Sequence, residues 1–80
     1  MTDDEILAVI EDVARDHGLW EGALTPELRL IEDLELDSLK ALTLAVEVEN
    51  ALRVCLDPEI EGKIVTVGDL VAMVRRELEN

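Results

Sequence analysis

The sequence predicts an all-α fold, a bundle of three main helices and one short helix, with a long loop between the first two main helices. Three stretches place apolar residues at helical spacing, and no stretch shows the sustained alternation of a strand. Of the 80 residues, 49% are apolar and only 1% aromatic, so the core must be aliphatic. This length predicts one domain, residues 1–80, with no room for a deep catalytic cleft.

The first main helix is expected over residues 3–17. Thr2 and Glu5 have the spacing of a capping box, and Gly18 can stop the helix at its C-terminal end. One face of this stretch is apolar: Ile6, Val9, Ile10 and Val13.

Residues 18–37 lose the helical periodicity, and glycines and a proline interrupt them. Thr25 and Pro26 have the pattern of a cap and first position, which predicts a single helical turn inside this loop. A loop this long is expected to be packed or functional. Its regularly placed apolar residues favour a packed loop: Leu24, Leu28, Leu30, Ile31 and Leu34.

The second main helix is expected to begin at Asp37 or Ser38 and to end near Leu52. Apolar residues lie around most of its circumference, which predicts a central helix buried on several sides. Its one polar stripe is expected to face water or a partner and comprises Lys40, Thr43, Glu47 and Asn50.

Two further helices are expected after residue 56. Asp57 and Pro58 have the pattern of a cap and first position, which predicts a very short helix ending at Gly62. Thr66 and Asp69 form a second capping pair at the start of the last main helix. The apolar face of that helix comprises Val67, Leu70, Val71, Val74 and Leu78.

The net charge of −13 comes from 20 acidic and 7 basic residues. Such a chain lacks the basic surface that phosphate backbones require, so nucleic acid is not an expected partner, whereas proteins with basic patches are. The acidic N-terminal residues do not resemble a secretory signal, and Glu47 breaks the longest apolar stretch. We therefore expect a cytoplasmic monomer with no membrane span. Cys55, the single cysteine, is expected to be a buried small hydrophobe.

The composition also argues against catalysis. A nucleophilic serine needs a base, and the only histidine, His17, lies at the far end of the first helix with no motif relating it to Ser38. His17 is better interpreted as a helix C-terminal residue that favours the helix dipole. The sequence contains no Cys/His cluster, calcium-loop spacing or glycine-rich phosphate loop. No catalytic, metal or nucleotide site is therefore expected.

The remaining feature is the segment Leu36-Asp37-Ser38-Leu39, which on its own could be an ordinary helix cap. In context, residues 30–39 (LIEDLELDSL) resemble the modification-site segment of acyl carrier proteins. In that family an apolar pair, an acidic pair, Leu, Gly, any residue and Asp-Ser-Leu follow in this order. Residues 64–67 (IVTV) resemble the family's entry to its final helix, and the order of elements agrees over essentially the whole chain.

This resemblance implies an acyl-carrier-like bundle that performs no catalysis of its own. A phosphopantetheinyl transferase would use coenzyme A to attach a covalent 4'-phosphopantetheine arm to Ser38, and Asp37 would present the site. The arm's thiol would carry acyl or aminoacyl groups as thioesters. Its partners would be an acyl-loading or adenylating enzyme and the synthase or modifying enzymes of the pathway. Trp20, the only aromatic residue, would either pack in the loop against the first helix or contact the cargo.

Two features depart from the family pattern. Glu35 replaces the usual glycine, so the backbone there either does not need a positive φ or tolerates strain. Partner enzymes are expected to dock on the second helix, where fatty-acid carriers place acids just after the serine. Here the docking residues are Leu39, Lys40, Thr43 and Glu47.

This different charge pattern favours a specialised carrier for a polyketide, nonribosomal peptide or related pathway, with a fatty-acid pathway left open. The alternative from another class is an unmodified acidic helical module that binds a basic protein through the second helix. In that case Ser38 would serve only as a cap.

Overall fold

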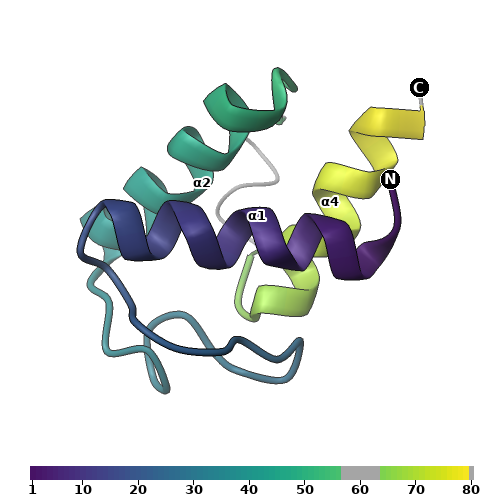
Figure 1. The fold of residues 1–80 in the computed structure, drawn as a ribbon. Helices are drawn as coiled ribbons and strands as arrows, with labels where there is room; N and C mark the ends of the chain where they lie inside the picture. The colour runs from purple at the N-terminus through teal and green to yellow at the C-terminus, as the bar shows by residue number, and fades with distance from the viewer. Residues whose placement is uncertain (57–63, 80) are drawn as a thin grey trace.

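The computed structural model describes residues 1–56 and 64–79, which form three helices and no strand. Helix α1 spans Asp3–Asp16, α2 spans Ser38–Leu52 and α4 spans Val67–Glu79. Figure 1 shows α1 crossing in front of the other two helices, and it packs against both. The three predicted main helices are therefore confirmed. The short helix predicted up to Gly62 lies outside the described residues.

The N-terminus of α1 carries the predicted capping box. The Thr2 hydroxyl accepts a hydrogen bond from the Glu5 N–H at 3.2 Å, and the Glu5 carboxylate accepts one from the Thr2 N–H at 3.0 Å. The hydrogen bond from the Thr2 N–H lowers the pKa of the Glu5 carboxyl. The two hydrogen bonds satisfy two backbone groups at this end, so α1 begins where its local sequence predicts.

The core is aliphatic, and the segment between α1 and α2 contributes to it. Leu24, Leu30, Leu34 and Leu36 are buried together with the inner faces of the three helices. Ile31, which was expected to pack, is wrongly predicted: it is 55% exposed, because the chain turns at residues 30–33 and leaves this side chain outside. The predicted helical turn at Thr25 is a single hydrogen-bonded turn, in which the Leu28 N–H donates to the Thr25 carbonyl.

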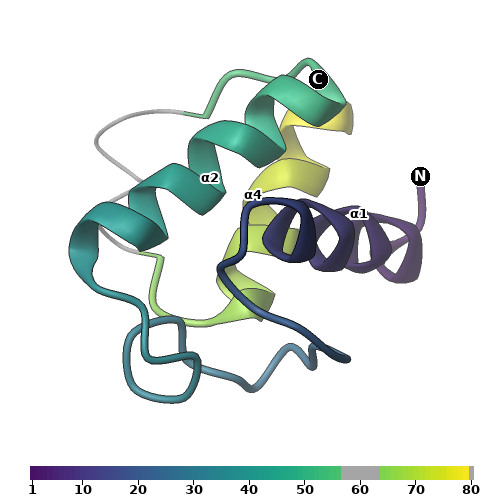
Figure 2. The ribbon, with the colours of Figure 1, turned by 60° about the vertical axis from the view of Figure 1, so that its left-hand side comes forward.

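The segment before α2 is tied to the start of α4. The Leu30 N–H donates to the Val65 carbonyl, and the Gly68 N–H donates to the Pro26 carbonyl, both at 2.9 Å. A Cβ at Gly68 would lie 3.0 Å from the Pro26 carbonyl oxygen, so the glycine permits this close approach. Figure 2 shows the loop beneath α4 and rising to the N-terminal end of α2.

Two predictions about exposure need correction, one at α2 and one just beyond it. Helix α2 was expected to be buried on several sides, but Leu42 and Val46 are exposed as well as the docking residue Leu39, because only one face of α2 packs on the core. Cys55 is also exposed and not a buried hydrophobe. Arg53 ends α2 with a φ of 55°, and the buried position beyond it is taken by Leu56.

The start of α4 should make stability depend on pH. The Asp69 carboxylate accepts hydrogen bonds from the Thr66 and Val65 N–H groups at 3.0 Å, and these bonds lower its pKa. A lowered pKa stabilises the fold above pH 3.8, the ordinary value for this group, and the contribution disappears as the pH falls through the folded-state pKa. Asp69→Asn is therefore expected to lower the free energy of unfolding at neutral pH by about 0.5–1 kcal/mol.

Urea unfolding at several pH values, followed by circular dichroism, measures this effect. The difference between the wild-type chain and Asp69→Asn should shrink as the solution is acidified, because the Asp69 carboxyl becomes protonated and then carries no charge, like the asparagine side chain. A difference that stayed constant down to acid pH would contradict this role of Asp69.

Candidate functional site

Ser38 lies at the junction between the loop and α2. It is the first residue of this 15-residue helix and is exposed. The amides of the first turn and the positive end of the helix dipole surround this position, which makes it favourable for an anionic group. The hydroxyl is thus accessible at the positively polarised end of α2.

Asp37, and not Ser38, caps this helix. Asp37 has the extended backbone of an N-cap, and its carboxylate accepts a hydrogen bond from the Lys40 N–H at 2.7 Å. Its carbonyl oxygen also accepts a hydrogen bond from the Ala41 N–H at 2.9 Å. The sequence left open which of the two residues starts the helix; the structure assigns the capping role to Asp37, so the Ser38 hydroxyl is not needed for it.

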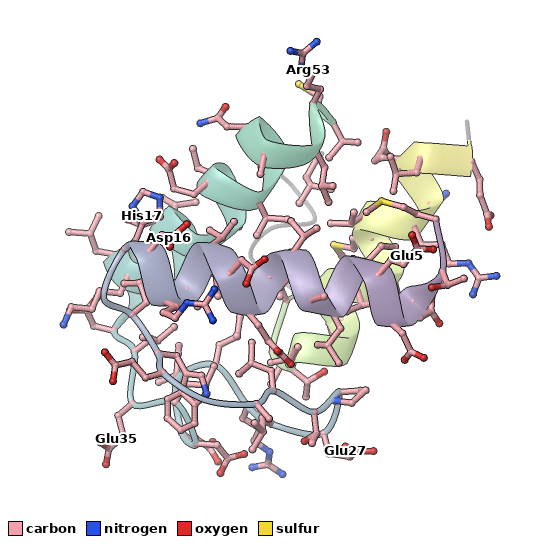
Figure 3. All side chains as sticks on the ribbon, in the orientation of Figure 1. Glu5, Asp16, His17, Glu27, Glu35 and Arg53 are labelled. Carbon is pink, nitrogen blue, oxygen red and sulfur yellow. The ribbon has the colours of Figure 1, made fainter. Side chains whose placement is uncertain are left out.

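The residues just before Ser38 hold the junction in place. Leu34 and Leu36 are buried, and the Leu36 N–H donates to the Leu30 carbonyl at 3.2 Å. Between them Glu35 has a φ of 57°, in the left-handed region that glycine tolerates best. Its side chain points away from the helices into solvent (Figure 3). The sequence left open whether the backbone at Glu35 avoids a positive φ or tolerates the strain of one. The structure shows the second alternative.

Glu35→Gly is expected to raise the free energy of unfolding by about 0.5–1 kcal/mol, because relief of the backbone strain outweighs the extra freedom of the unfolded chain. Urea unfolding of the two chains measures it. Glu21→Gly is a matched control, since Glu21 is an exposed glutamate of the same loop without a positive φ. Glu21→Gly should lower the free energy of unfolding. If Glu35→Gly lowered it by as much, the result would contradict backbone strain at Glu35.

The proposed docking residues lie on α2 after Ser38, but they are not equally accessible. Leu39 and Lys40 are exposed, whereas Thr43 and Glu47 are half-buried. The Thr43 hydroxyl donates to the Leu39 carbonyl at 2.9 Å. Of the proposed docking residues, those in the first turn of α2 are therefore the most exposed.

His17 reaches α2, which sequence reasoning missed. Its Nε2 atom lies 3.3 Å from a carboxylate oxygen of Glu47, a residue of α2, and Figure 3 shows His17 close to this helix. Nothing in the local sequence signals this pair, because the two residues belong to different helices. Glu47 is about 13 Å along the helix axis from Ser38, so His17 is not placed to take a proton from the serine.

Three other features of the described residues bear on function. They contain no group of three or more His, Cys, Asp or Glu side chains arranged to hold a metal ion. A groove of about 280 Å³ lies between the N-terminus of α1 and α4, and its lining includes Asp3, Pro26, Val71 and Arg75. None of its lining residues belongs to α2. Nor is any helix in residues 1–56 and 64–79 both long and apolar enough to cross a membrane.

Comparison with known proteins identifies the family. The chain is 39% identical to an acyl carrier protein of Rubrobacter xylanophilus over 75 residues, covering 92% of this chain and 93% of the relative. It is 34% identical to the meromycolate extension acyl carrier protein of Mycobacterium tuberculosis, covering 100% of this chain and 71% of the relative. The chain belongs to the acyl carrier protein family. No family model matches it.

The structure of this carrier protein agrees with that assignment. A solved structure of a candidate acyl carrier protein from Mycobacterium tuberculosis superposes with a TM-score of 0.73 at 28% identity. The superposition covers 92% of this chain and 95% of the other. Acyl carriage is therefore the function of this protein, as the resemblance of residues 30–39 implied.

Proposed function

We propose that Ser38 is the attachment point of a 4'-phosphopantetheine arm whose thiol carries acyl or aminoacyl groups as thioesters. The observation that carries this proposal is that two different residues provide the helix cap and the accessible hydroxyl at the start of α2. Asp37 caps the helix through the Lys40 N–H, which leaves the exposed Ser38 hydroxyl available for modification. Ser38 is also the only serine of the chain.

Attachment is a phosphoryl transfer from coenzyme A. The Ser38 Oγ attacks the phosphorus on the pantetheine side of the diphosphate, a new P–O bond forms, and the bond to the departing adenosine 3',5'-bisphosphate breaks. The hydroxyl proton passes to a base of the transferase, because His17 is engaged with Glu47 on another part of α2. The product is a phosphodiester with one negative charge, which the first-turn amides of α2 stabilise.

The chain's own part in this reaction is positional. Asp37 fixes the first turn of α2 and so presents the serine, and the buried Leu34 and Leu36 hold the preceding segment against the core. The carrier performs no catalysis itself. The enzymes that act on it are a phosphopantetheinyl transferase, an acyl-loading or adenylating enzyme, and the synthase or modifying enzymes of its pathway.

We propose a specialised pathway (polyketide, nonribosomal peptide or related), with a fatty-acid pathway as the alternative, in which the protein acts in the cytoplasm as a monomer. Lys40 and Thr43 support this, because they put a cation and a neutral residue where acidic residues would meet basic partner enzymes. Several relatives are named meromycolate extension acyl carrier proteins.

The test is the intact mass of the purified chain after incubation with coenzyme A and a broad-specificity phosphopantetheinyl transferase. A gain of one phosphopantetheine unit per chain is the expected result. No gain would overturn the proposal and favour the unmodified interaction module. Incubation without coenzyme A is the control for adventitious adducts.

A further inference from the structure

An apolar strip runs along the exposed side of α2, starting next to Ser38. It consists of Leu39, Leu42 and Val46, which are 72%, 46% and 38% exposed. Their spacing of three and four residues places them on one side of the helix. Exposing three large aliphatic side chains on one face costs solubility, so such a strip indicates a contact surface.

The charges around this strip differ from those of the chain as a whole. The chain has 20 acidic and 7 basic residues, yet α2 has only Lys40, Glu47 and Glu49. Lys40 is exposed beside the strip, and Glu47 already lies within ion-pair distance of His17. Glu49 is half-buried. Within α2, the exposed charge next to the strip is therefore positive, whereas the exposed acidic residues Glu35 and Asp37 lie before the helix.

We propose that the partner enzymes of this carrier meet α2 with an apolar hollow that has an acidic group opposite Lys40. This inference rests on the proposed function and specifies the chemistry of the partner. A basic docking patch would repel Lys40. Glu47, the acidic residue near the strip, would first have to separate from His17 before it could contact such a patch. An apolar hollow buries the strip, and a carboxylate beside it complements the lysine.

Two phosphopantetheinyl transferases serve as probes, one with an apolar carrier-binding surface and one with an arginine-rich surface. The measured quantity is kcat/KM for modification of the full chain with coenzyme A. The wild-type chain should be the better substrate of the apolar enzyme. Leu42→Asp should lower that rate about tenfold, because it places a charge in the centre of the contact. Lys40→Glu should raise the rate with the arginine-rich enzyme about threefold.

Leu78→Asp is the matched control, since Leu78 is an exposed leucine on α4 that lies outside the strip. It should leave both rates unchanged. Circular dichroism checks that each variant is folded, and Leu39→Asp replaces Leu42→Asp if the latter unfolds, because Leu39 is the most exposed member of the strip.

The outcomes separate the inference from the proposed function. If the arginine-rich enzyme modified the wild-type chain at least as fast and substitutions in the strip changed neither rate, the inference would be overturned. Failure of both enzymes to add the arm would overturn the proposed function and the inference with it. Sedimentation equilibrium provides the last test: a wild-type dimer that Leu42→Asp dissociates would assign the strip to a second copy of the chain.

Discussion

Ser38→Ala is expected to abolish loading of the phosphopantetheine arm while the protein remains folded. The substitution removes the only serine of the chain, and thus the hydroxyl proposed to attack coenzyme A. Stability should change by less than about 0.5 kcal/mol, since an exposed side chain is lost and Asp37 retains the capping hydrogen bond to the Lys40 N–H. Intact mass after incubation with transferase and coenzyme A measures loading, and urea unfolding measures stability.

Thr25→Ala is the matched control for Ser38→Ala. It removes an exposed hydroxyl from the loop before α2, and this hydroxyl is neither proposed to react nor part of the docking residues. The control should gain one phosphopantetheine unit. A Ser38→Ala chain that still gained this mass would place the arm on another residue and refute the assignment.

Leu44→Ala is expected to lower the free energy of unfolding by about 3 kcal/mol. Leu44 is 0% exposed on the inner face of α2 and belongs to the core together with Ile6, Ile10 and Leu70. Truncating it leaves a cavity that this small bundle cannot fully close. The loss is large compared with the roughly 5–15 kcal/mol by which proteins are folded, so urea unfolding should show a clear shift of the midpoint.

Leu42→Ala is the same chemical change on the same helix, made on the exposed side. It should alter the free energy of unfolding by less than about 0.5 kcal/mol. Equal losses for the two variants would mean that α2 does not orient its faces as described.

Features that depend on neighbouring residues were predictable from the sequence. The start of α1 follows from Thr2 and Glu5, and the start of α4 follows from Thr66 and Asp69, because a capping box joins residues three apart. The three main helices follow from apolar spacing in the same way. The segment around Ser38 was found by its resemblance to a family, since a serine at a helix start has too little local signal.

The tertiary structure decided which surfaces remain open. Leu42 and Leu44 are alike in the sequence, but only one lies against the core, and Cys55 is exposed although Val54 and Leu56 flank it. The contact of His17 with Glu47 likewise required two helices to meet.

The sequence by itself thus determined the helices, the capping residues of α1 and α4, and the candidate serine, because short-range hydrogen bonds and helical periodicity depend on residues that are close in the sequence. Only the tertiary structure determined that Asp37 caps α2 while Ser38 stays accessible, and that Leu39, Leu42 and Val46 form an open strip. The physical reason is that the exposure of a side chain depends on which distant segments cover it. Local spacing does not contain that information.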